Sequence, residues 1–586
     1  MLSDFSKQRE MKTSLRAESP ATNKATDYEA ETAFLGEWGR FQQQVFFFLC
    51  LTIIPNGFTA LAIVFLADTP PHHCLVPAHL NLTDAWRNSS IPLEEDESRG
   101  SALVPSKCSR YKLDYLVSFS ERGLLPGVDV NLSNVPKEYC LDGWEYDHSV
   151  YTSTIITEWD LVCDQSWKNP LTSSFFFCGV LTGSFISGQL SDRYGRKIVL
   201  FATTALQLVS TFVEVFSQSW TAFCAVYFFI GLSQISNYVA AFVLGTEILG
   251  PCVRTVFSTA GVCLFFALGY MLLPLVAFFI RDWRMLLIGL TLPHCLCMPL
   301  WWFIPESPRW LLSQGRVQEA AAIIRQAAKT NKIEPPPVIF SPLQKEIKSE
   351  KKGTHNICDL LRTRNIRWIS ITLWLVWNTL TIAYLGLSLN TSNLHGNAYF
   401  NCFLSALVEM PAYTLSWVMF RWCSRRLSLF STLFMGGLFL LIIQLIPADL
   451  VYLAITLEMI GKFAVTTAFA IVYAYSAEVY PTVLRNTAVG TCSMASRIGS
   501  ITAPFFIYLR SYSVSLPYIL MGTLTALTAL LSLLLPESFG MPLPDTITHM
   551  QQFPGCCRKT PYTLTNTDEG ENSTQDASVK SDLMTK

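Results

Sequence analysis

The chain has 586 residues, of which 51% are hydrophobic, 13% aromatic and only 15% charged, and its formal net charge is −1. Soluble domains carry about 25% charged residues, so this composition indicates a membrane protein with several spans rather than a soluble globular domain. Without a basic excess, the composition offers no support for a nucleic-acid partner.

The chain begins with a polar tail, residues 1–42, which is predicted to be cytoplasmic. The first apolar run starts near Val45 and extends to Leu66. This run is too long for the apolar region of a signal peptide and long enough to cross a bilayer. It therefore predicts the first transmembrane helix.

Residues 67–168 form a long polar segment before apolar sequence resumes. A loop of this length usually folds on its own or carries a function. It contains four cysteines and three glycosylation sequons, at Cys74, Cys108, Cys140, Cys163, Asn81, Asn88 and Asn131. This combination predicts an extracellular, disulfide-bonded and glycosylated domain, in which the three possible cysteine pairings stay open.

Apolar runs of membrane-spanning length fill most of the remaining chain. Together with the first run they lie at about 45–66, 171–190, 198–216, 221–242, 256–279, 285–304, 368–389, 399–419, 427–447, 450–474, 487–509 and 515–535. The expected fold is an all-α membrane protein with twelve transmembrane helices in two six-helix halves, residues 43–304 and 368–535. A basic linker with helices, residues 305–367, joins the halves, and residues 536–586 form a cytoplasmic tail.

The positions of the basic residues predict which side of the membrane each loop faces. A glycine-rich turn, Gly188 to Lys197, joins the second and third runs. Short loops with an excess of Lys and Arg favour the cytoplasmic side. With the first loop outside and an even number of spans, both termini are predicted to be cytoplasmic, and the expected location is the plasma membrane.

Two features of the first half recur in the second half at one offset. Glu247 and Arg254 flank a proline after the fourth span, and Glu478 and Arg485 flank a proline after the tenth. The sequence Pro-Glu-Ser follows both the sixth and the twelfth span. Corresponding positions are separated by 231 residues, which indicates duplicated six-helix halves.

Charged residues at the cytoplasmic ends of the helices are predicted to control which side of the protein is open. Charge pairs there can form in one arrangement of the halves and break in the other. The alternative is that these charges only fix the topology. The candidates are Asp192, Arg193, Arg196, Lys197, Glu247, Arg254, Glu306, Arg309 and Arg485, with Glu247–Arg254, Glu306–Arg309 and Glu478–Arg485 as expected members of one network.

Several motifs resemble one known family. The turn at 188–197, the run Pro-Glu-Ser-Pro-Arg-Trp-Leu-Leu at 305–312 and the long first loop resemble the organic ion transporter (solute carrier 22) family of the major facilitator superfamily. Four further segments resemble its organic cation/carnitine branch: Ala33 to Gly39, Ile54 to Phe58, Gln234 to Glu247 and Ala495 to Ser500. The resemblance implies carriers of carnitine with sodium, of betaines such as ergothioneine, and of organic cations.

Arg497 lies in the middle of the eleventh span, where a charge is costly and marks a candidate functional residue. Its guanidinium suits carboxylate recognition, and pairing with an acidic residue in the membrane is the alternative. The 231-residue offset pairs Arg497 with Phe266, so one side of the cavity is charged and the other aromatic, which suits a zwitterion. Further candidates are aromatic rings for a quaternary ammonium and nearby polar groups, Tyr238, Trp377, Tyr384, Asn237 and Glu409.

The other charges within spans are less specific. Glu409 is expected either to hold the ammonium end of a substrate or to pair with Lys462. Glu458 precedes Lys462 by four residues, the favourable order for a pair on one helix face, so it is a second candidate partner of Lys462.

The sequence Pro55-Asn56-Gly57 in the first span is the physical candidate for sodium binding. Proline frees backbone carbonyls, glycine loosens the helix, and Asn56 adds an amide oxygen. A kink without function is the alternative. By resemblance, Glu478 at the inner end of the tenth span affects sodium coupling.

The sequence therefore predicts a secondary active transporter and not an enzyme. Its expected function is sodium-coupled uptake of carnitine or a related zwitterionic betaine, and of organic cations, by alternating access. The alternatives are a sodium-independent organic cation or ergothioneine carrier and, from another class, a receptor or adhesion protein that uses the first loop. No cofactor or metal is expected besides the coupling sodium ion; the expected partners are a small-molecule substrate and the bilayer, with the monomer as the functional unit.

Overall fold

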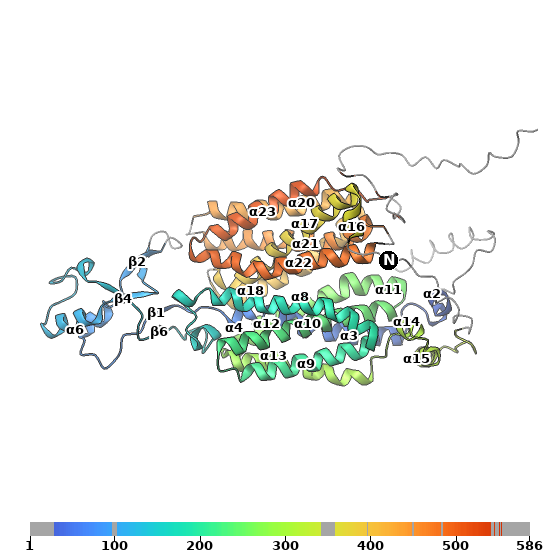
Figure 1. Cartoon of the computed structure of the whole chain (residues 1–586), viewed down its shortest axis with the longest axis horizontal. Coiled ribbons are helices and arrows are strands. Elements are labelled where there is room, and N and C mark those ends of the chain that lie inside the picture. The colour runs from blue at the N-terminus through green and yellow to red at the C-terminus, as the bar shows by residue number, and fades with distance from the viewer. Residues whose placement is uncertain are drawn as a thin grey trace, which may run out of the picture.

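In the computed structural model, the described residues are 28–96, 102–340, 358–394, 396–447, 450–481 and 484–540, together with Pro544, Met550 and Phe553. They form a bundle of long helices with a small domain projecting from one end (Figure 1). Residues 1–27 and 554–586, which make up most of the two predicted tails, lie outside the described residues.

The first half of the bundle lies on one side in Figure 1 and consists of the blue to green helices. Its long helices are α3 (Arg40–Leu61) with its continuation α4 (Ile63–Leu66), α8 (Lys168–Tyr194), α9 (Arg196–Val215), α10 (Trp220–Ile248), α12 (Val262–Phe279) and α13 (Trp283–Cys297). The short helix α11 (Pro251–Val256) and one π-helical turn, η5 (Phe257–Gly261), lead into α12.

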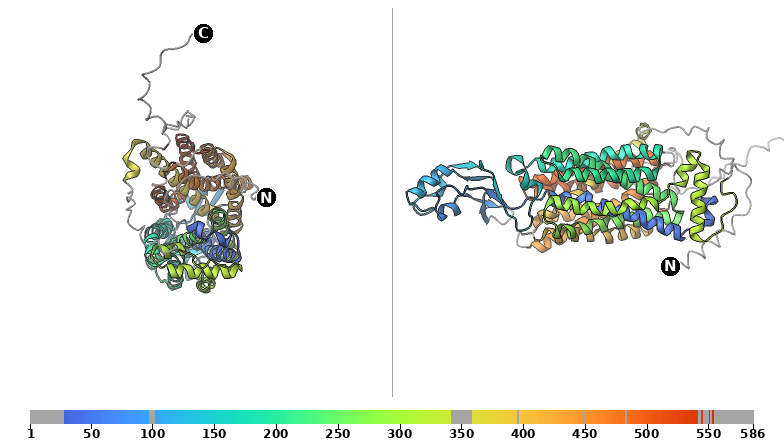
Figure 2. Two further views of the ribbon diagram at one scale, coloured as in Figure 1. Left: turned by 90° about the vertical axis from the view of Figure 1, so that its right-hand side faces the viewer. Right: turned by 90° about the horizontal axis from the view of Figure 1, so that it is seen from below.

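The second half consists of the yellow to red helices on the other side. They are α17 (Arg364–Leu389), α18 (Ala398–Leu407) followed by α19 (Glu409–Trp422), α20 (Arg425–Ile442), α21 (Val451–Val479), α22 (Arg485–Tyr508) and α23 (Leu516–Ser532). The end-on view in Figure 2 shows the two groups of helices as separate bundles, one above the other.

The prediction of twelve spans is confirmed. Ten helical segments among the described residues are long and apolar enough to cross a membrane, and α23 is a shorter apolar helix. The remaining span is α22, a 24-residue helix whose composition is more polar because it carries Arg497 and several Ser and Thr residues. Each predicted run corresponds to one of these helices.

Small residues allow close packing within each half. A Cβ atom on Gly57 of α3 would lie 2.2 Å from the carbonyl oxygen of Phe266, and one on Gly269 of α12 would lie 2.1 Å from that of Ile54. Glycine at both positions therefore brings α3 and α12 into backbone contact, as small residues do between membrane helices. The helix α3 continues through Pro55 and Gly57.

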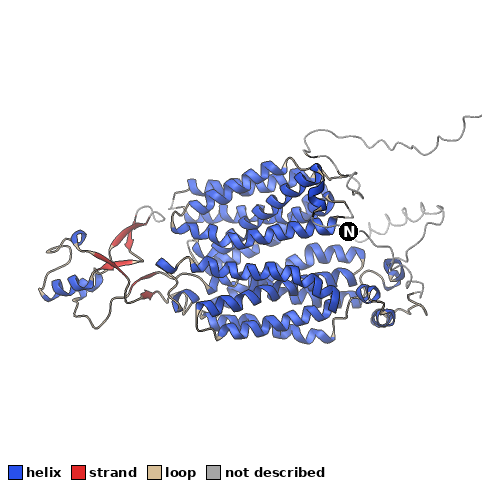
Figure 3. Ribbon diagram, in the orientation of Figure 1, coloured by secondary structure: helices blue, strands red, loops and turns tan. Residues whose placement is uncertain are grey.

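The projecting domain is built from residues between the first two spans, and Figure 3 shows the described strands gathered there. It contains three two-stranded antiparallel sheets, β1 (His72–Cys74) with β6 (Trp144–Tyr146), β2 (Leu93–Asp96) with β3 (Ala102–Pro105), and β4 (Ser109–Tyr111) with β5 (Lys137–Tyr139). A small core around Trp86 and Leu116 of α5 (Asp84–Asn88) and α6 (Leu113–Glu121) closes it. Below, this unit is called the loop domain.

Two disulfides join distant parts of the loop domain, Cys74–Cys140 and Cys108–Cys163. Beside them, the buried guanidinium of Arg110 forms ion pairs with Glu138 at 2.9 Å and Asp142 at 2.6 Å. These cross-links compensate for the small apolar core. The sequence leaves three pairings of the four cysteines open, and the structure contains Cys74–Cys140 and Cys108–Cys163.

The opposite end of the bundle, called the linker end here, is covered by short helices. They are α2 (Tyr28–Glu31), α14 (Pro308–Ser313) and α15 (Val317–Asn331), which pack around Leu35, Trp310 and Ile324. The indole nitrogen of Trp310 donates to the carbonyl of Asp192 at 2.9 Å and thereby attaches α14 to the end of α8. Figure 2 shows this cluster at the end opposite the loop domain.

The two halves make their described hydrogen bonds to each other toward the loop-domain end. Ser174 of α8 donates to the carbonyl of Ile501 in α22 at 2.8 Å, and the Tyr270 hydroxyl of α12 donates to Ser405 of α18 at 3.1 Å. The Tyr399 hydroxyl of α18 reaches the carbonyl of Val150 at 3.3 Å. The ion pairs of the described residues at the linker end, by contrast, each lie within one half. The halves are therefore joined near the loop domain.

Candidate functional site

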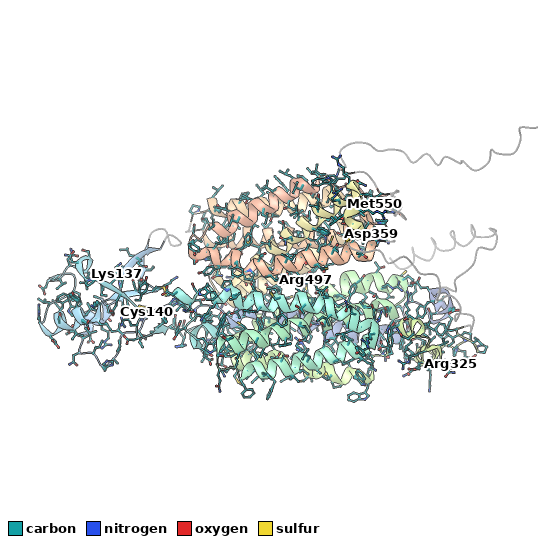
Figure 4. All side chains as sticks on the ribbon, viewed as in Figure 1. Lys137, Cys140, Arg325, Asp359, Arg497 and Met550 are labelled. Carbon is teal, nitrogen blue, oxygen red and sulfur yellow. A yellow bond between two sulfur atoms is a disulfide. The ribbon has the colours of Figure 1, made fainter. Side chains whose placement is uncertain are left out.

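Arg497 lies about midway along the bundle, at the place labelled in Figure 4 where α22 faces the other half. Its helix packs closely on α17, because a Cβ atom on Gly499 would lie 2.6 Å from the carbonyl oxygen of Asn378. Asn378 in turn donates to the carbonyl of Ala495 at 3.1 Å. The Nε atom of Arg497 is buried and has no hydrogen-bond partner among the described residues. Its guanidinium thus has spare donors for a ligand.

Two tyrosines, one from each half, lie close enough to Arg497 to interact with its charge. Tyr238 of α10 and Tyr473 of α21 both interact electrostatically with its guanidinium. Tyr238 lies edge-on to Phe266, with ring centroids 6.3 Å apart, so two predicted residues of the first half are neighbours. Tyr473 is 41% exposed although it lies in the middle of the bundle, which indicates solvent-accessible space between the halves at this level.

The predicted aromatic residues of the second half are joined by rings that sequence reasoning missed. Trp377 lies 4.2 Å from Tyr473 and 5.9 Å from Phe469 between ring centroids, and Tyr384 stacks on Phe469 at 5.8 Å. Phe469 and Tyr473 are four residues apart on one face of α21, a spacing that could have indicated them. Trp377 itself is fully buried and donates to Ser476, so it supports the cavity wall.

Glu409 and Lys462 form a buried ion pair at 3.2 Å. Lys462 also donates to Ser388 at 3.0 Å and to Ser405 at 2.5 Å, and Glu409 accepts from Tyr384 at 2.8 Å. Of the two expectations for Glu409, this geometry matches pairing with Lys462. The pair also reaches the first half, since Lys462 lies 3.4 Å from the Tyr270 hydroxyl.

Glu458 does not form the expected pair with Lys462. Its carboxylate accepts from Asn390 at 3.2 Å and from the Tyr518 hydroxyl at 2.9 Å. The helix α21 presents Glu458 to α23 and Lys462 to α18, so spacing along the helix is outweighed by contacts with neighbouring helices. The expectation of direct pairing is therefore corrected.

Asn56 and Asn237 belong to a buried polar cluster within the first half. The Asn56 amide donates to Asn237 at 3.1 Å, and the Asn237 amide donates to Thr204 of α9. Gln234 lies 3.4 Å from the carbonyl oxygen of Asn56. The side-chain oxygens of Asn56 and Gln207 are buried without a partner in the described residues. These oxygens are free acceptors of the kind that bind a hard cation.

At the linker end, the charges of the first half form one compact cluster. Arg196 pairs with Glu247 at 3.0 Å and with Asp192 at 2.9 Å. Glu306 accepts from the backbone N–H groups of Arg196 and Lys197 at 3.0–3.2 Å. Gly195 has φ = 107°, and a Cβ atom there would lie 2.5 Å from Glu306, so only glycine fits the turn. Arg193 is exposed and lies against the ring of Tyr194.

The second half repeats this cluster. Arg425 pairs with Glu478 at 3.1 Å, and Glu537 accepts from the backbone N–H groups of Arg425 and Arg426 at 2.8 and 3.1 Å. Burial opposes ionisation of Glu537, but these bonds and one from Ser424 hold the pKa of Glu537 below its usual value. Arg425 is thus the counterpart of Arg196, although the residue numbers differ by 229 instead of 231.

Three expected pairings at the linker end are corrected. Arg254 and Arg309 both pair with Glu29 of α2, at 3.0 and 2.7 Å, in place of Glu247 and Glu306. The hydrogen bond from Arg309 holds the pKa of Glu29 below its usual value. The Nε and Nη2 atoms of Arg485 have no hydrogen-bond partner among the described residues. The pairings were predicted from positions that recur in the two halves. Glu29 was not considered, because α2 lies outside the repeat.

The two residues predicted to act in sodium binding or coupling lie far apart. Asn56 lies inside the first half, whereas Glu478 lies at the linker end of the second, where Arg425 and Ser538 donate to its carboxylate.

The three predicted glycosylation positions, Asn81, Asn88 and Asn131, are all exposed on the loop domain.

Two similar six-helix halves, a charged and aromatic region between them, and matching charge clusters at one end define a membrane transporter. A transporter works when the halves rock about the central region, so that it opens to one side and then to the other. The family described as "Sugar (and other) transporter" matches residues 131–547. The match covers most of both halves.

Similar proteins of known name indicate the branch of this large family to which the chain belongs. Organic cation/carnitine transporter 2 of Mus musculus is 58% identical over 530 residues, which cover 90% of this chain and 95% of the relative. The Homo sapiens protein of the same name is 58% identical over 537 residues, covering 91% and 96%. Solute carrier family 22 member 4 of Mus musculus is 55% identical over 530 residues, covering 90% and 95%.

Solved structures agree on the fold. A xylose transporter of E. coli in an inward-open conformation superposes with a TM-score of 0.56 at 14% identity and covers 87% of this chain and all of its own. The proton:xylose symporter bound to a bromodeoxyglucose gives 0.52 at 15% identity, covering 86% and 98%. The chain belongs to the organic cation/carnitine transporters of the solute carrier 22 family, within the major facilitator superfamily. It is a multi-pass membrane transporter and not an enzyme.

Proposed function

We propose that this transporter carries out sodium-coupled uptake of carnitine or a related zwitterionic betaine, and also of organic cations, by alternating access. The observation that carries the proposal is the guanidinium of Arg497, which has a free buried donor in a region lined by aromatic rings from both halves. The relatives named organic cation/carnitine transporter 2 support the same substrate class.

The chemistry of the central region matches the two ends of a betaine. A guanidinium binds a carboxylate through two parallel hydrogen bonds. A quaternary ammonium group lacks N–H donors and is attracted to aromatic faces. Tyr238 and Tyr473 supply such rings near Arg497, and Phe266 lies edge-on to Tyr238. The carboxylate of Glu409 is neutralised by Lys462, so the substrate carboxylate does not face an unpaired acid there.

We assign the loop domain to the outside of the plasma membrane and both termini to the cytoplasm. Its two disulfides and three exposed sequons support this orientation. The halves are joined at the loop-domain end, so this conformation is the one open to the cytoplasm. In the outward-open conformation the Arg196 and Arg425 clusters are expected to approach each other and rearrange.

We place the coupling sodium ion near Asn56, where two side-chain oxygens, from Asn56 and Gln207, lack partners. The backbone carbonyls freed by Pro55 would complete the ligands. Glu478 is expected to act in the charge cluster, because Arg425 and Ser538 engage its carboxylate. The monomer is expected to be the functional unit, since each chain contains both halves.

Uptake into proteoliposomes tests the proposal. The full chain is reconstituted, and labelled carnitine and ergothioneine are offered with an inward gradient of sodium or of lithium. Carnitine accumulation above the outside concentration with sodium alone supports the proposal. Ergothioneine or cation uptake that rises only to the outside concentration and is equal with sodium and with lithium supports the sodium-independent carrier, and binding without uptake supports the receptor.

A further inference from the structure

We propose that the first half contains a separate binding site for one monovalent cation, a proton or a sodium ion, built around Glu214. Glu214 lies in the last turn of α9, near the loop-domain end. A small cavity there is lined by apolar side chains such as Leu66 and Leu290 and by six polar ones from four helices of the first half: Thr59, Thr211, Glu214, Tyr227, Thr291 and His294. None of them belongs to the Arg497 region.

Glu214 is fully buried, and both of its carboxylate oxygens lack a hydrogen-bond partner among the described residues. The Tyr227 hydroxyl and the Nε2 atom of His294 line the same cavity and are also without partners there. A buried carboxylate without hydrogen bonds or a counter-charge is strongly unfavourable, so it takes up a proton or coordinates a cation. Glu214, Tyr227 and His294 thus present three polar groups without protein partners to one cavity.

The threonines make the cavity rich in acceptors. The hydroxyl protons of Thr59, Thr211 and Thr291 are already donated to the carbonyls of Pro55, Gln207 and Leu287, at 2.9, 2.9 and 2.6 Å. Their oxygens can therefore only accept hydrogen bonds or coordinate a cation, and that of Thr59 already accepts from the Gln207 amide at 3.3 Å. With the carboxylate and His294, these groups call for an occupant of positive charge.

The charged and titratable groups around Glu214 leave it without a counter-ion. Tyr227 and Cys224 face it from α10, and His294 lines the cavity from α13. Arg284, which donates to the carbonyl of the neighbouring residue Val215, uses its other donors on Glu158 and on the carbonyl of Ser217. The carbonyls at the end of α9 add partial negative charge beside Glu214, which favours a cation further.

The size of the cavity limits the occupant. Its volume is about 20 Å³, which accommodates one water-sized particle, since a single water needs at least roughly 10–15 Å³. A sodium ion or a protonated carboxyl group fits, and an organic cation does not. Because Glu214 is the residue before the end of α9, the site lies close to the loop-domain end of the bundle.

The test measures thermal unfolding of the purified full chain in detergent. In one arm the sodium concentration rises at constant pH, with N-methylglucamine as replacement; in the other the pH falls at constant sodium. A ligand that binds only the folded chain raises the unfolding midpoint. Glu214→Gln, which removes the charge at constant volume, is compared with the wild type and with Glu319→Gln, whose residue lies in an exposed pair with Arg316.

We expect Glu214→Gln to lose the midpoint shift in at least one arm, and that arm identifies the cation. Thr211→Val, which removes one acceptor, should raise the half-saturating concentration severalfold, and Glu319→Gln should behave as the wild type. Repeating the series in an Asn56→Ala background separates this site from the sodium site proposed near Asn56. If Glu214→Gln folds and keeps both wild-type responses in that background, the inference is overturned. If Glu214→Gln does not fold, Thr211→Val takes its place in the test. Midpoint shifts of Thr211→Val with sodium and with pH that equal those of the wild type would then overturn the inference.

Discussion

The buried pair Glu409–Lys462 allows a sharp test of how charges are held inside the second half. The two side chains are 0% and 1% exposed and 3.2 Å apart. At this distance and an effective dielectric constant of about 20, their attraction is about 5 kcal/mol. Removing one partner leaves the other buried and uncompensated, so Glu409→Gln and Lys462→Met should each destabilise the protein by about 3–5 kcal/mol.

The double substitution should be much less harmful than the sum of the single ones, because it leaves no unpaired charge. We expect a coupling free energy of about 3 kcal/mol or more from a double-mutant cycle, measured by equilibrium unfolding in detergent. Glu458→Gln is the matched control: its amide oxygen can still accept from Asn390 or from Tyr518, and losing the other bond should cost about 1 kcal/mol. Additive effects of Glu409→Gln and Lys462→Met, or strong coupling of Lys462 to Glu458, would refute the reasoning.

Three further results are expected. Arg425→Ala removes charge-assisted hydrogen bonds to Glu478, worth about 1.5–3 kcal/mol, from the described conformation; transport should slow about tenfold with little change in substrate affinity, and an unchanged rate would exclude a role in gating. Burial raises the pKa of Asp68, beside Ser392 of the other half, to about 6 from 3.8. Its contribution is therefore fully present below the ordinary carboxyl pKa and is lost as pH rises through about 6, so unfolding midpoints should fall across this range in the wild type and less in Asp68→Asn. The sequon asparagines Asn81, Asn88 and Asn131 are replaced by glutamine one after another in protein expressed in cells. Each replacement should increase the mobility of the protein on a gel, and no change in any variant would argue against the extracellular assignment of the loop domain.

The spans and the repeat could be predicted because both depend on local patterns. A membrane helix requires a long apolar run whatever its neighbours are, so hydropathy along the chain is sufficient. The more polar helix α22 could also be predicted, because the sequence on both sides of Arg497 is apolar enough to mark a span. Positive charge likewise reports topology directly, without knowledge of contacts.

The partners of charged residues could not be predicted in the same way. A fixed offset of 231 pairs Glu247 with Glu478, but it misses Arg425 as the counterpart of Arg196, because the two halves differ by two residues in that turn. Glu29 was missed because it lies in the segment before the first span, far in sequence from Arg254 and Arg309. Such contacts depend on the packing of helices that only the three-dimensional structure contains.

Glu214 shows the same limit most clearly. In the sequence it stands at the end of an apolar run, where an exposed acid is unremarkable, and only the packing of α9 against α10 and α13 buries it. The second-half rings Phe469 and Tyr473 were missed although their spacing was visible. Aromatic residues are frequent in membrane helices, and most of them pack against lipid or other helices.

The central claim, that Arg497 recognises the carboxylate of a zwitterion, is tested most directly by a ratio of uptakes. Carnitine uptake and tetraethylammonium uptake are measured side by side for wild type, Arg497→Lys and Arg497→Ala, with surface expression as normalisation. A lost carboxylate–guanidinium contact of about 1.5–3 kcal/mol corresponds to roughly a 10- to 150-fold loss. The account predicts that Arg497→Ala loses carnitine uptake by such a factor while tetraethylammonium uptake persists, with partial activity in Arg497→Lys. Equal uptake of carnitine by Arg497→Ala and wild type would contradict it.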